Sequence, residues 1–287
     1  RSGVPFEYGR PRDHAVQPMT LMFQIGGHEH GSFERFRNVG YAQKYKKPNH
    51  GDEEVWKEAQ ANGDMEPFQS HTMGWWWCET KPDQIGSNFT HIAGKNPTDA
   101  KDLTDATIEG RRQAYLSLEV FRKYLPGMEH AWLSHTAALI GTRESRRIAG
   151  KYYITAEDLI AEKEFGDSIG YGSFYIDVHS CTKAGMDGET YYPRKGFKYQ
   201  IPFRALVPRG IDNLLVAGRC VSCDHLALGS LRVMPQCFLE GDAAGVAAAL
   251  AIENHSAPGE ISIPDLQAKL RGFGAIITSE DIVIQSR

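Results

Sequence analysis

The sequence predicts a mixed α/β fold, in which an antiparallel sheet domain stands beside part of a nucleotide-binding-type domain. Residues 17–27 (QPMTLMFQIGG) alternate apolar and polar positions, which is the period of a half-buried strand. Residues 213–219 (NLLVAGR) form a short apolar run that ends near a glycine, and residues 235–253 form an alanine-rich helix candidate. A buried strand followed by a loop and a helix is typical of a parallel α/β layer.

The remaining elements follow from periodicity and turn residues. The clearest amphipathic helix spans residues 105–124 and is stopped by Leu125-Pro126-Gly127. Thr155 and Asp158 stand three apart at the start of a short helix, which is the spacing of a capping box. The other expectations are a short helix at 53–61, strands at 72–79, 87–93, 173–178 and 199–203, and an extended segment at 131–140.

The composition is that of a globular protein with a substantial core. Lys and Arg number 32 against 36 Asp and Glu, so the net charge is −4, and this balance lacks the basic excess that nucleic acid would attract. The longest apolar run, residues 245–252, is far shorter than the ~20 residues of a membrane-spanning helix, so no membrane contact is expected. Five cysteines form an odd set, which favours a reducing, cytoplasmic compartment and leaves secretion or a periplasmic location open.

One candidate for proton transfer lies in the segment Ile176-Asp177-Val178-His179. On a strand, Asp177 and His179 would share one side, where a carboxylate can fix the tautomer of an imidazole and raise its basicity. Such a pair could take a proton during oxidation of a substrate. The alternative is a hydrogen-bonded pair at a strand end. No metal site is expected, because the other histidines show no tight ligand pattern with acidic partners.

A second candidate is the charged block that follows the apolar stretch at 131–140. Alternation along a strand would place Glu144 and Arg146 on one face, and Arg143, Ser145 and Arg147 on the other. One face could enter an active-site cleft. The alternative is a solvated surface or a structural ion network.

Several ordered blocks resemble the FAD-dependent oxidoreductase family, whose members are sometimes labelled xanthan lyases. The C-terminal signature is carried by NLLVAGR (213–219), ALGSLRVM (227–234) and GDAAGVAAA (241–249). Upstream support comes, in the same order as in the family, from QPMTLMFQIGG (17–27), RESRRIAG (143–150), YYITAEDL (152–159), IDVH (176–179) and IPFRAL (201–206). The resemblance covers most of the chain and implies a Rossmann-like FAD domain interrupted by a substrate domain with a mixed or antiparallel sheet.

The resemblance also assigns residues. It places Gly218 and Arg219 at the end of a strand beside the cofactor, and Arg232 where a guanidinium could stabilise reduced flavin or a substrate oxygen; a buried ion pair is the alternative for Arg232. It also favours a functional role for Arg143 over a purely structural one. The wall and helix against the flavin would be formed by Leu231, Met234, Gly241, Ala244 and Gly245.

One family feature is missing from these residues. The family begins with a strand, a GxGxxG turn and a helix that hold the FAD pyrophosphate, and no such motif occurs here. We therefore expect that half to be supplied elsewhere, for example by a companion chain. Cys220 and Cys223 have CxxC spacing, which indicates two buried thiols or a disulfide coupled to the flavin.

Together these observations predict a substrate domain over residues 1–200 and the C-terminal segment of an FAD-binding domain over residues 201–287. The expected function is oxidation of a small organic, sugar-like substrate by hydride transfer to FAD, by the chain alone or with its companion half, in a protein that could form oligomers. His179 with Asp177 would accept the proton, and Arg232 and Arg143 would polarise oxygen. The alternatives are a non-catalytic binding or assembly subunit that has lost the cofactor half, and a polysaccharide lyase, which only the family label suggests.

Overall fold

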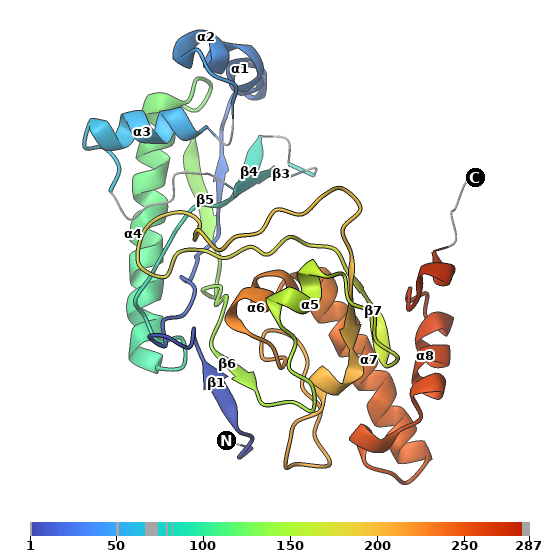
Figure 1. The fold of residues 1–287 in the computed structure, drawn as a ribbon. Coiled ribbons are helices and arrows are strands. Elements are labelled where there is room, and N and C mark those ends of the chain that lie inside the picture. The colour runs from blue at the N-terminus through green and yellow to red at the C-terminus, as the bar shows by residue number, and fades with distance from the viewer. Residues whose placement is uncertain (1, 50–51, 67–73, 79, 82, 283–287) are drawn as a thin grey trace. The chain divides into compact units, whose positions relative to one another are not determined.

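A computed structural model describes residues 2–49, 52–66, 74–78, 80–81 and 83–282 (Figure 1). The chain divides into two compact units. Unit 1 contains residues 1–15, 144–178 and 188–287, and unit 2 contains residues 16–143 and 179–187. These boundaries differ from the expected domains at 1–200 and 201–287, which were defined by function and stay a prediction.

Unit 2 is built on a four-stranded antiparallel sheet with strand order β3-β4-β2-β5. The predicted strand at 17–27 is confirmed in its second half as β2 (Phe23–Gly26), and the extended segment contains β5 (Trp132–Thr136). The strand predicted at 87–93 begins earlier, as β4 (Gln84–Asn88). The strand predicted at 72–79 is β3 (Gly74–Trp77), and residues 72, 73 and 79 lie outside the described residues.

Helix α4 (Ala100–Tyr124) covers the core side of this sheet. It begins at Asp99, whose side chain accepts a hydrogen bond from the backbone N–H of Asp102, and it ends before Leu125, as predicted. Its buried face reaches β2, where Phe121 stacks on Phe23 with 6.3 Å between the ring centroids. The smaller helical elements of unit 2 are α1 (His30–Arg35), the π-helix η1 (Phe36–Gly40), α2 (Tyr41–Tyr45) and the predicted α3 (Glu53–Ala61).

The consecutive tryptophans of β3 point to opposite faces of the sheet, as a period of two requires. Trp75 and Trp77 pack against the core of unit 2, whereas Trp76 is 43% exposed. The indole of Trp76 lies across Gly86 of β4, where an added Cβ would come within 2.2 Å of the ring. Glycine at position 86 is therefore what allows this ring to lie flat on the sheet.

Unit 1 has two small antiparallel pairs and a helical layer. β1 (Phe6–Tyr8) pairs with β6 (Arg146–Ile148), and β7 (Ser168–Gly172) pairs with β8 (Tyr199–Pro202). Helix α7 (Met234–Glu253) runs beside α8 (Ile263–Gly272), as Figure 1 shows, and buries its alanines in the core of the unit. The other elements are α5 (Ala156–Ile160) with the predicted capping box, α6 (His225–Leu231), and the 3-10 helices η2 (Phe203–Leu206), η3 (Pro258–Glu260) and η4 (Ser279–Asp281).

Two predicted strands are absent from unit 1. Residues 173–178 contain only an isolated bridge between Ile176 and Tyr191, and residues 213–219 form no strand. The apolar residues 214–217 are half-buried, and the backbone N–H of Val216 donates to the carbonyl of Leu206. A central parallel strand needs neighbours on both edges, and no described residues supply them, so the mixed α/β class is confirmed without a parallel sheet.

No described helix is both long enough and apolar enough to cross a membrane.

Candidate functional site

The segment from Asp224 to Arg232 organises the polar groups of unit 1. Asp224 caps α6, because its carboxylate accepts the backbone N–H of Ala227 at 2.6 Å, and it also accepts that of Ala156 at 2.8 Å. Gly229 in the same helix lies against the backbone of Asp177, where an added Cβ would approach the Asp177 carbonyl oxygen to 2.9 Å. The sequence thus fixes the start of α6 and holds Asp177 close to its side.

Asp177 and Arg232, both predicted site residues, form a buried ion pair. The Nη2 of Arg232 donates to Oδ2 of Asp177 at 2.8 Å and to the Asp177 carbonyl at 2.9 Å. Their side chains are only 11% and 10% exposed. Burial lowers the pKa of Arg232, and the Asp177 carboxylate opposes that change. The carboxylate of Asp177 is therefore positioned to orient a guanidinium, while its predicted pairing with His179 stays a prediction.

The other two predicted catalytic residues, His179 and Arg143, belong to unit 2, where both surround His91. The rings of His91 and His179 lie 6.2 Å apart, and the backbone N–H of His179 donates to Gln17. Burial, followed by the charges of Arg143 and His179, lowers the pKa of His91 to about 4, so His91 is neutral at pH 7. Arg143 is anchored to the carbonyl of Pro18 at 2.8 Å and to the hydroxyl of Thr20 at 2.6 Å.

The charged block at 143–147 does not follow the predicted alternation. Glu144 and Arg147 are both fully buried and paired with each other, whereas Arg146 is exposed and lies over the ring of Phe6. The prediction that Glu144 shares a face with Arg146 is wrong because β6 begins only at Arg146, so a strand period does not extend back to Glu144.

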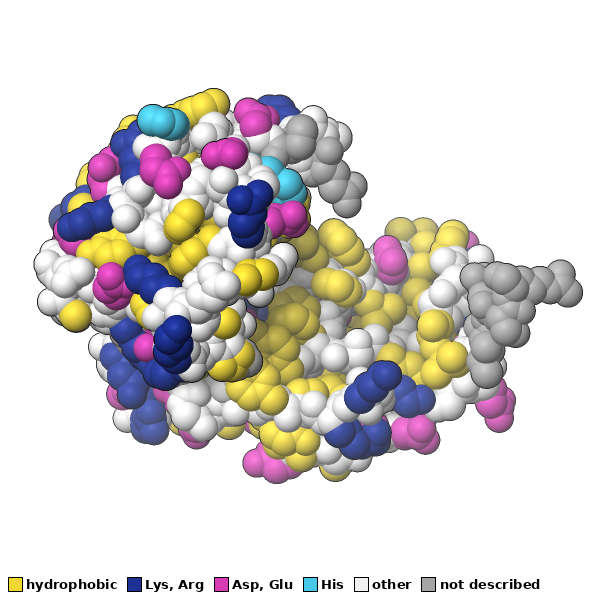
Figure 2. All heavy atoms as spheres, turned by 90° about the horizontal axis from the view of Figure 1, so that it is seen from above, with side chains coloured by type: hydrophobic (Ala, Val, Ile, Leu, Met, Phe, Trp, Pro, Cys, Tyr) yellow, Lys and Arg dark blue, Asp and Glu magenta, His cyan; other side chains and the backbone are white. Residues whose placement is uncertain are grey.

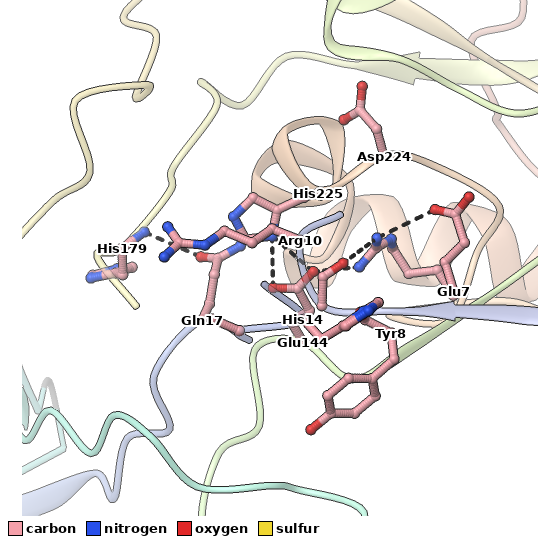
Figure 3. A network of polar contacts seen from close by, with 12 residues as sticks. Glu7, Tyr8, Arg10, His14, Gln17, Glu144, His179, Asp224 and His225 are labelled. Carbon is pink, nitrogen blue, oxygen red and sulfur yellow. Dashed lines mark hydrogen bonds and ion pairs between the residues drawn. The ribbon is translucent and has the colours of Figure 1, made fainter. Parts of the chain in front are cut away.

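The strongest imidazole–carboxylate pair of unit 1 was not predicted from the sequence. The Nδ1 of His225 lies 2.9 Å from the Glu144 carboxylate, as Figure 3 shows. Arg147 holds the same carboxylate and also donates to the carbonyls of Cys223 and Gly9, each at 2.8 Å. The two members of the pair stand 81 residues apart, and of the two only Glu144 lies in a segment that the sequence analysis singled out, the charged block.

A pocket of about 280 Å³ opens beside this pair. His225 lines it from the start of α6 and is only 5% exposed. The pocket carries charges of both signs together with two apolar side chains, and its other lining residues are Arg10, Pro11, Arg12, Glu189, Asp224 and Leu226.

Helix α7 presents an open stripe of apolar and small residues. Met234 and Phe238 are 72% and 68% exposed. Gly241 and Gly245 continue the stripe at helical spacing, and an added Cβ at either glycine would meet nothing within 4 Å. Figure 2 shows hydrophobic side chains gathered on the visible face of the part of the molecule that ends in the grey C-terminal residues.

The remaining residues expected near the cofactor lie in several environments. Gly218 adopts a φ of 80°, in the region that favours glycine. Arg219 is exposed, Ala244 is half-buried, and Leu231 is fully buried in the core of unit 1.

A buried carboxyl stands on the inner side of α7. Glu240 is fully buried, and its Oε2 accepts the backbone N–H of Gly218 at 2.6 Å. Burial raises the pKa of Glu240 to about 8, so at pH 7 the carboxyl is mostly protonated. Its Oε1 is buried and has no hydrogen-bond partner among the described residues.

The CxxC pair contains free thiols. Cys223 is fully buried and Cys220 partly buried, and burial raises the pKa of both, which keeps them protonated. This environment fits two packed thiols better than a reactive pair. Among the described residues, no three His, Cys, Asp or Glu side chains gather in a way that could hold a metal ion.

The model of the FAD dependent oxidoreductase family matches residues 1–270. The chain belongs to this family. Membership implies FAD as the cofactor and an oxidoreductase activity. Searches of the curated proteins and of the solved structures found no match.

The residues of α7 fit a flat aromatic cofactor. A planar ring system needs close approach without side chains in the way, and the outward space at Gly241 and Gly245 meets that need.

Proposed function

We propose that the protein oxidises a small, hydroxyl-bearing, sugar-like substrate by hydride transfer to FAD. The oxidoreductase class and the cofactor follow from the family. The open stripe of α7 is the observation that best supports a flavin site on this chain.

The stripe would hold the cofactor by shape. Gly241, Ala244 and Gly245 leave room for a ring, and the exposed thioether of Met234 can pack against its face. Gly218 and Arg219 would lie at the edge, with Leu231 behind the wall. When bound, FAD supplies a two-electron acceptor for the hydride.

The predicted polarising residues are rigidly held, which favours a role in orienting substrate. Arg232 is fixed by Asp177, and Arg143 by the backbone of Pro18 and by Thr20. A fixed guanidinium can donate hydrogen bonds to a substrate oxygen without losing side-chain entropy at that step. His179 is the proton acceptor that the sequence predicts.

We further propose that the phosphate-binding half of the FAD domain covers α7 and residues 214–217. These residues are apolar and half-buried, and they form no strand by themselves. A neighbouring strand from a glycine-rich βαβ segment, on a companion chain or elsewhere in the polypeptide, would complete their hydrogen bonds.

Substitution at Gly245 tests the flavin site. A Cβ added at Gly245 meets no atom within 4 Å, so Gly245→Leu should preserve folding and raise helix propensity. We expect the variant to lose bound flavin, measured as absorbance near ~450 nm per protein chain. Gly31→Leu in α1, also with open space around its added Cβ, is the matched control. Full flavin retention in Gly245→Leu would exclude this location, and a wild-type protein that stays colourless with FAD and its companion half would favour the non-catalytic subunit.

Isotopic substitution tests the reaction. Flavin reduction by a sugar or alditol deuterated at the reacting carbon should be several-fold slower than reduction by the unlabelled compound, because the C–H bond breaks in that step. Equal rates for the two compounds, with reduction rather than binding shown to be limiting, would argue against hydride transfer.

A further inference from the structure

We propose that the pocket beside α6 is the substrate pocket, that it takes an uncharged polyol of about monosaccharide size, and that His225 accepts the proton of the reacting hydroxyl. This inference deepens the proposed function and rests on it. It assigns the proton acceptor to His225, and it uses a pair that the sequence did not reveal.

The hydrogen-bond partner of His225 fixes its chemistry. The Glu144 carboxylate has only acceptor oxygens when ionised, so the Nδ1 that faces it at 2.9 Å must carry the proton. In the neutral imidazole, Nε2 is then the basic nitrogen. A carboxylate behind Nδ1 stabilises the imidazolium that forms when Nε2 takes a proton.

The carboxylate behind the ring is itself rigidly held. Glu144 is fully buried, and the buried guanidinium of Arg147 both balances its charge and ties it to the backbone of Cys223 and Gly9. The backbone at His225 is fixed as well, because Asp224 caps the helix that begins there. Held at both ends, the ring keeps one orientation while it lines the pocket.

The charges of the lining select the ligand. Arg10 is engaged by Asp13 through two bonds of 2.7 Å, and Figure 3 shows Arg10 next to His225. Arg12 adds a second guanidinium, whereas Asp224 and Glu189 add two carboxyls, so the lining carries charged groups of both signs. A lining that mixes donors and acceptors suits a ligand with several hydroxyls better than an anion or a cation.

The size of the pocket limits the ligand further. Its volume of about 280 Å³ lies just below the ~300–1,000 Å³ of typical small-molecule sites. One sugar ring or a short alditol fits this volume better than an oligosaccharide does. Pro11 and Leu226 offer apolar surface for the carbon face of such a ring.

The chemical step balances with the cofactor of the family as oxidant. With FAD bound as the two-electron acceptor, the O–H bond of the substrate would break and its proton would pass to Nε2 of His225, while the carbon that bears this hydroxyl would lose its hydrogen with the bonding electron pair as hydride. The carbon–oxygen single bond becomes a carbonyl. The imidazolium later returns its proton to water.

The first test measures binding and needs no turnover. Glucose and mannitol are titrated calorimetrically into the protein, with glucuronate and serine as charged comparators. We expect the neutral compounds to bind more tightly than the charged ones, and Arg12→Ala and His225→Gln to weaken binding by about tenfold or more, as expected for loss of a hydrogen bond in a pocket. The matched control is His255→Gln, an exposed histidine outside the pocket. Preferential binding of a charged comparator, or unchanged binding in both pocket variants, would overturn the proposal.

The second test follows flavin reduction by substrate. His225→Gln should lose about 10²–10⁴-fold of the rate while flavin content and folding persist. Glu144→Gln should also slow reduction, because the imidazole loses the carboxylate that fixes its tautomer and stabilises the imidazolium. Added imidazole should restore part of the rate of His225→Gly, which a purely structural role of His225 would not allow.

The comparison with His179 decides the assignment. If His179→Gln loses the rate of flavin reduction while His225→Gln keeps it, the proposal is overturned in favour of the sequence prediction. If a wild-type protein with bound flavin is reduced by none of these polyols, the proposed function fails. The pocket assignment is then judged by the binding test alone.

Discussion

Replacing Glu240 by glutamine should change how the stability of unit 1 depends on pH. Burial raises the pKa of this carboxyl from 4.5 to about 8 in the folded protein. Between these two values the folded chain holds a proton that the unfolded chain releases, so stability falls as pH rises through this window. At 1.36 kcal/mol for each pH unit, the loss between pH 4.5 and pH 8 is on the order of 5 kcal/mol. In Glu240→Gln the amide keeps an oxygen for the N–H of Gly218 and cannot ionise.

The assay is urea unfolding of both proteins at pH 5, 6, 7 and 8. The free energy of unfolding of Glu240→Gln minus that of the wild type should rise by several kcal/mol from pH 5 to pH 8. Circular dichroism follows both units, whereas tryptophan fluorescence follows unit 2 alone, because all five tryptophans (56, 75, 76, 77 and 132) lie there. Glu253→Gln, on the exposed end of α7, is the control and should show no such trend. A difference that is constant with pH, or that grows as pH falls, would refute the burial argument.

Three further predictions concern local contacts. Asp177→Asn should lower the free energy of unfolding, measured in urea, by about 3–5 kcal/mol, because it leaves the Arg232 guanidinium buried without its carboxylate. Arg147→Met leaves the Glu144 carboxylate buried without its guanidinium, and a smaller loss in Asp177→Asn than in Arg147→Met would show that the Asp177 pair contributes less to stability. Thr155→Ala should cost about 0.5–2 kcal/mol through loss of the α5 capping box, and Thr155→Ser should recover most of it; equal stabilities would remove the cap from the explanation. Gly86→Ala should push the Trp76 indole off the sheet and change the tryptophan emission spectrum with little change in circular dichroism, whereas an unchanged spectrum would mean that the ring does not lie on Gly86.

The sequence revealed the elements that carry a local signal. The alanine-rich helix, the long amphipathic helix and the Thr155 capping box were all predicted close to their observed bounds, because periodicity and caps act within a few residues. Residues 213–219 were predicted as a strand from their apolar run. That prediction failed because strand formation needs a neighbouring strand, and the local sequence contains no information on whether one is present.

The contacts of the candidate site join residues that are far apart in the sequence, and these contacts could not be predicted from local patterns. Arg232 and Asp177 were chosen separately for their chemistry, and only the fold shows that they bind each other across 55 residues. The pair of His225 and Glu144 was not predicted, because a contact between residues 81 apart leaves no periodic trace in one sequence. The family resemblance supplied the cofactor, which no local pattern in this chain could have given.

The division of the chain also affects how the protein is made. Gly9, beside β1, receives a hydrogen bond from Arg147, and the two residues are separated by 138 positions that include most of unit 2. At about 5–20 residues per second, the ribosome needs roughly 7 to 28 seconds between these two points. We therefore expect unit 2 to begin folding on the nascent chain while β1 still waits for β6.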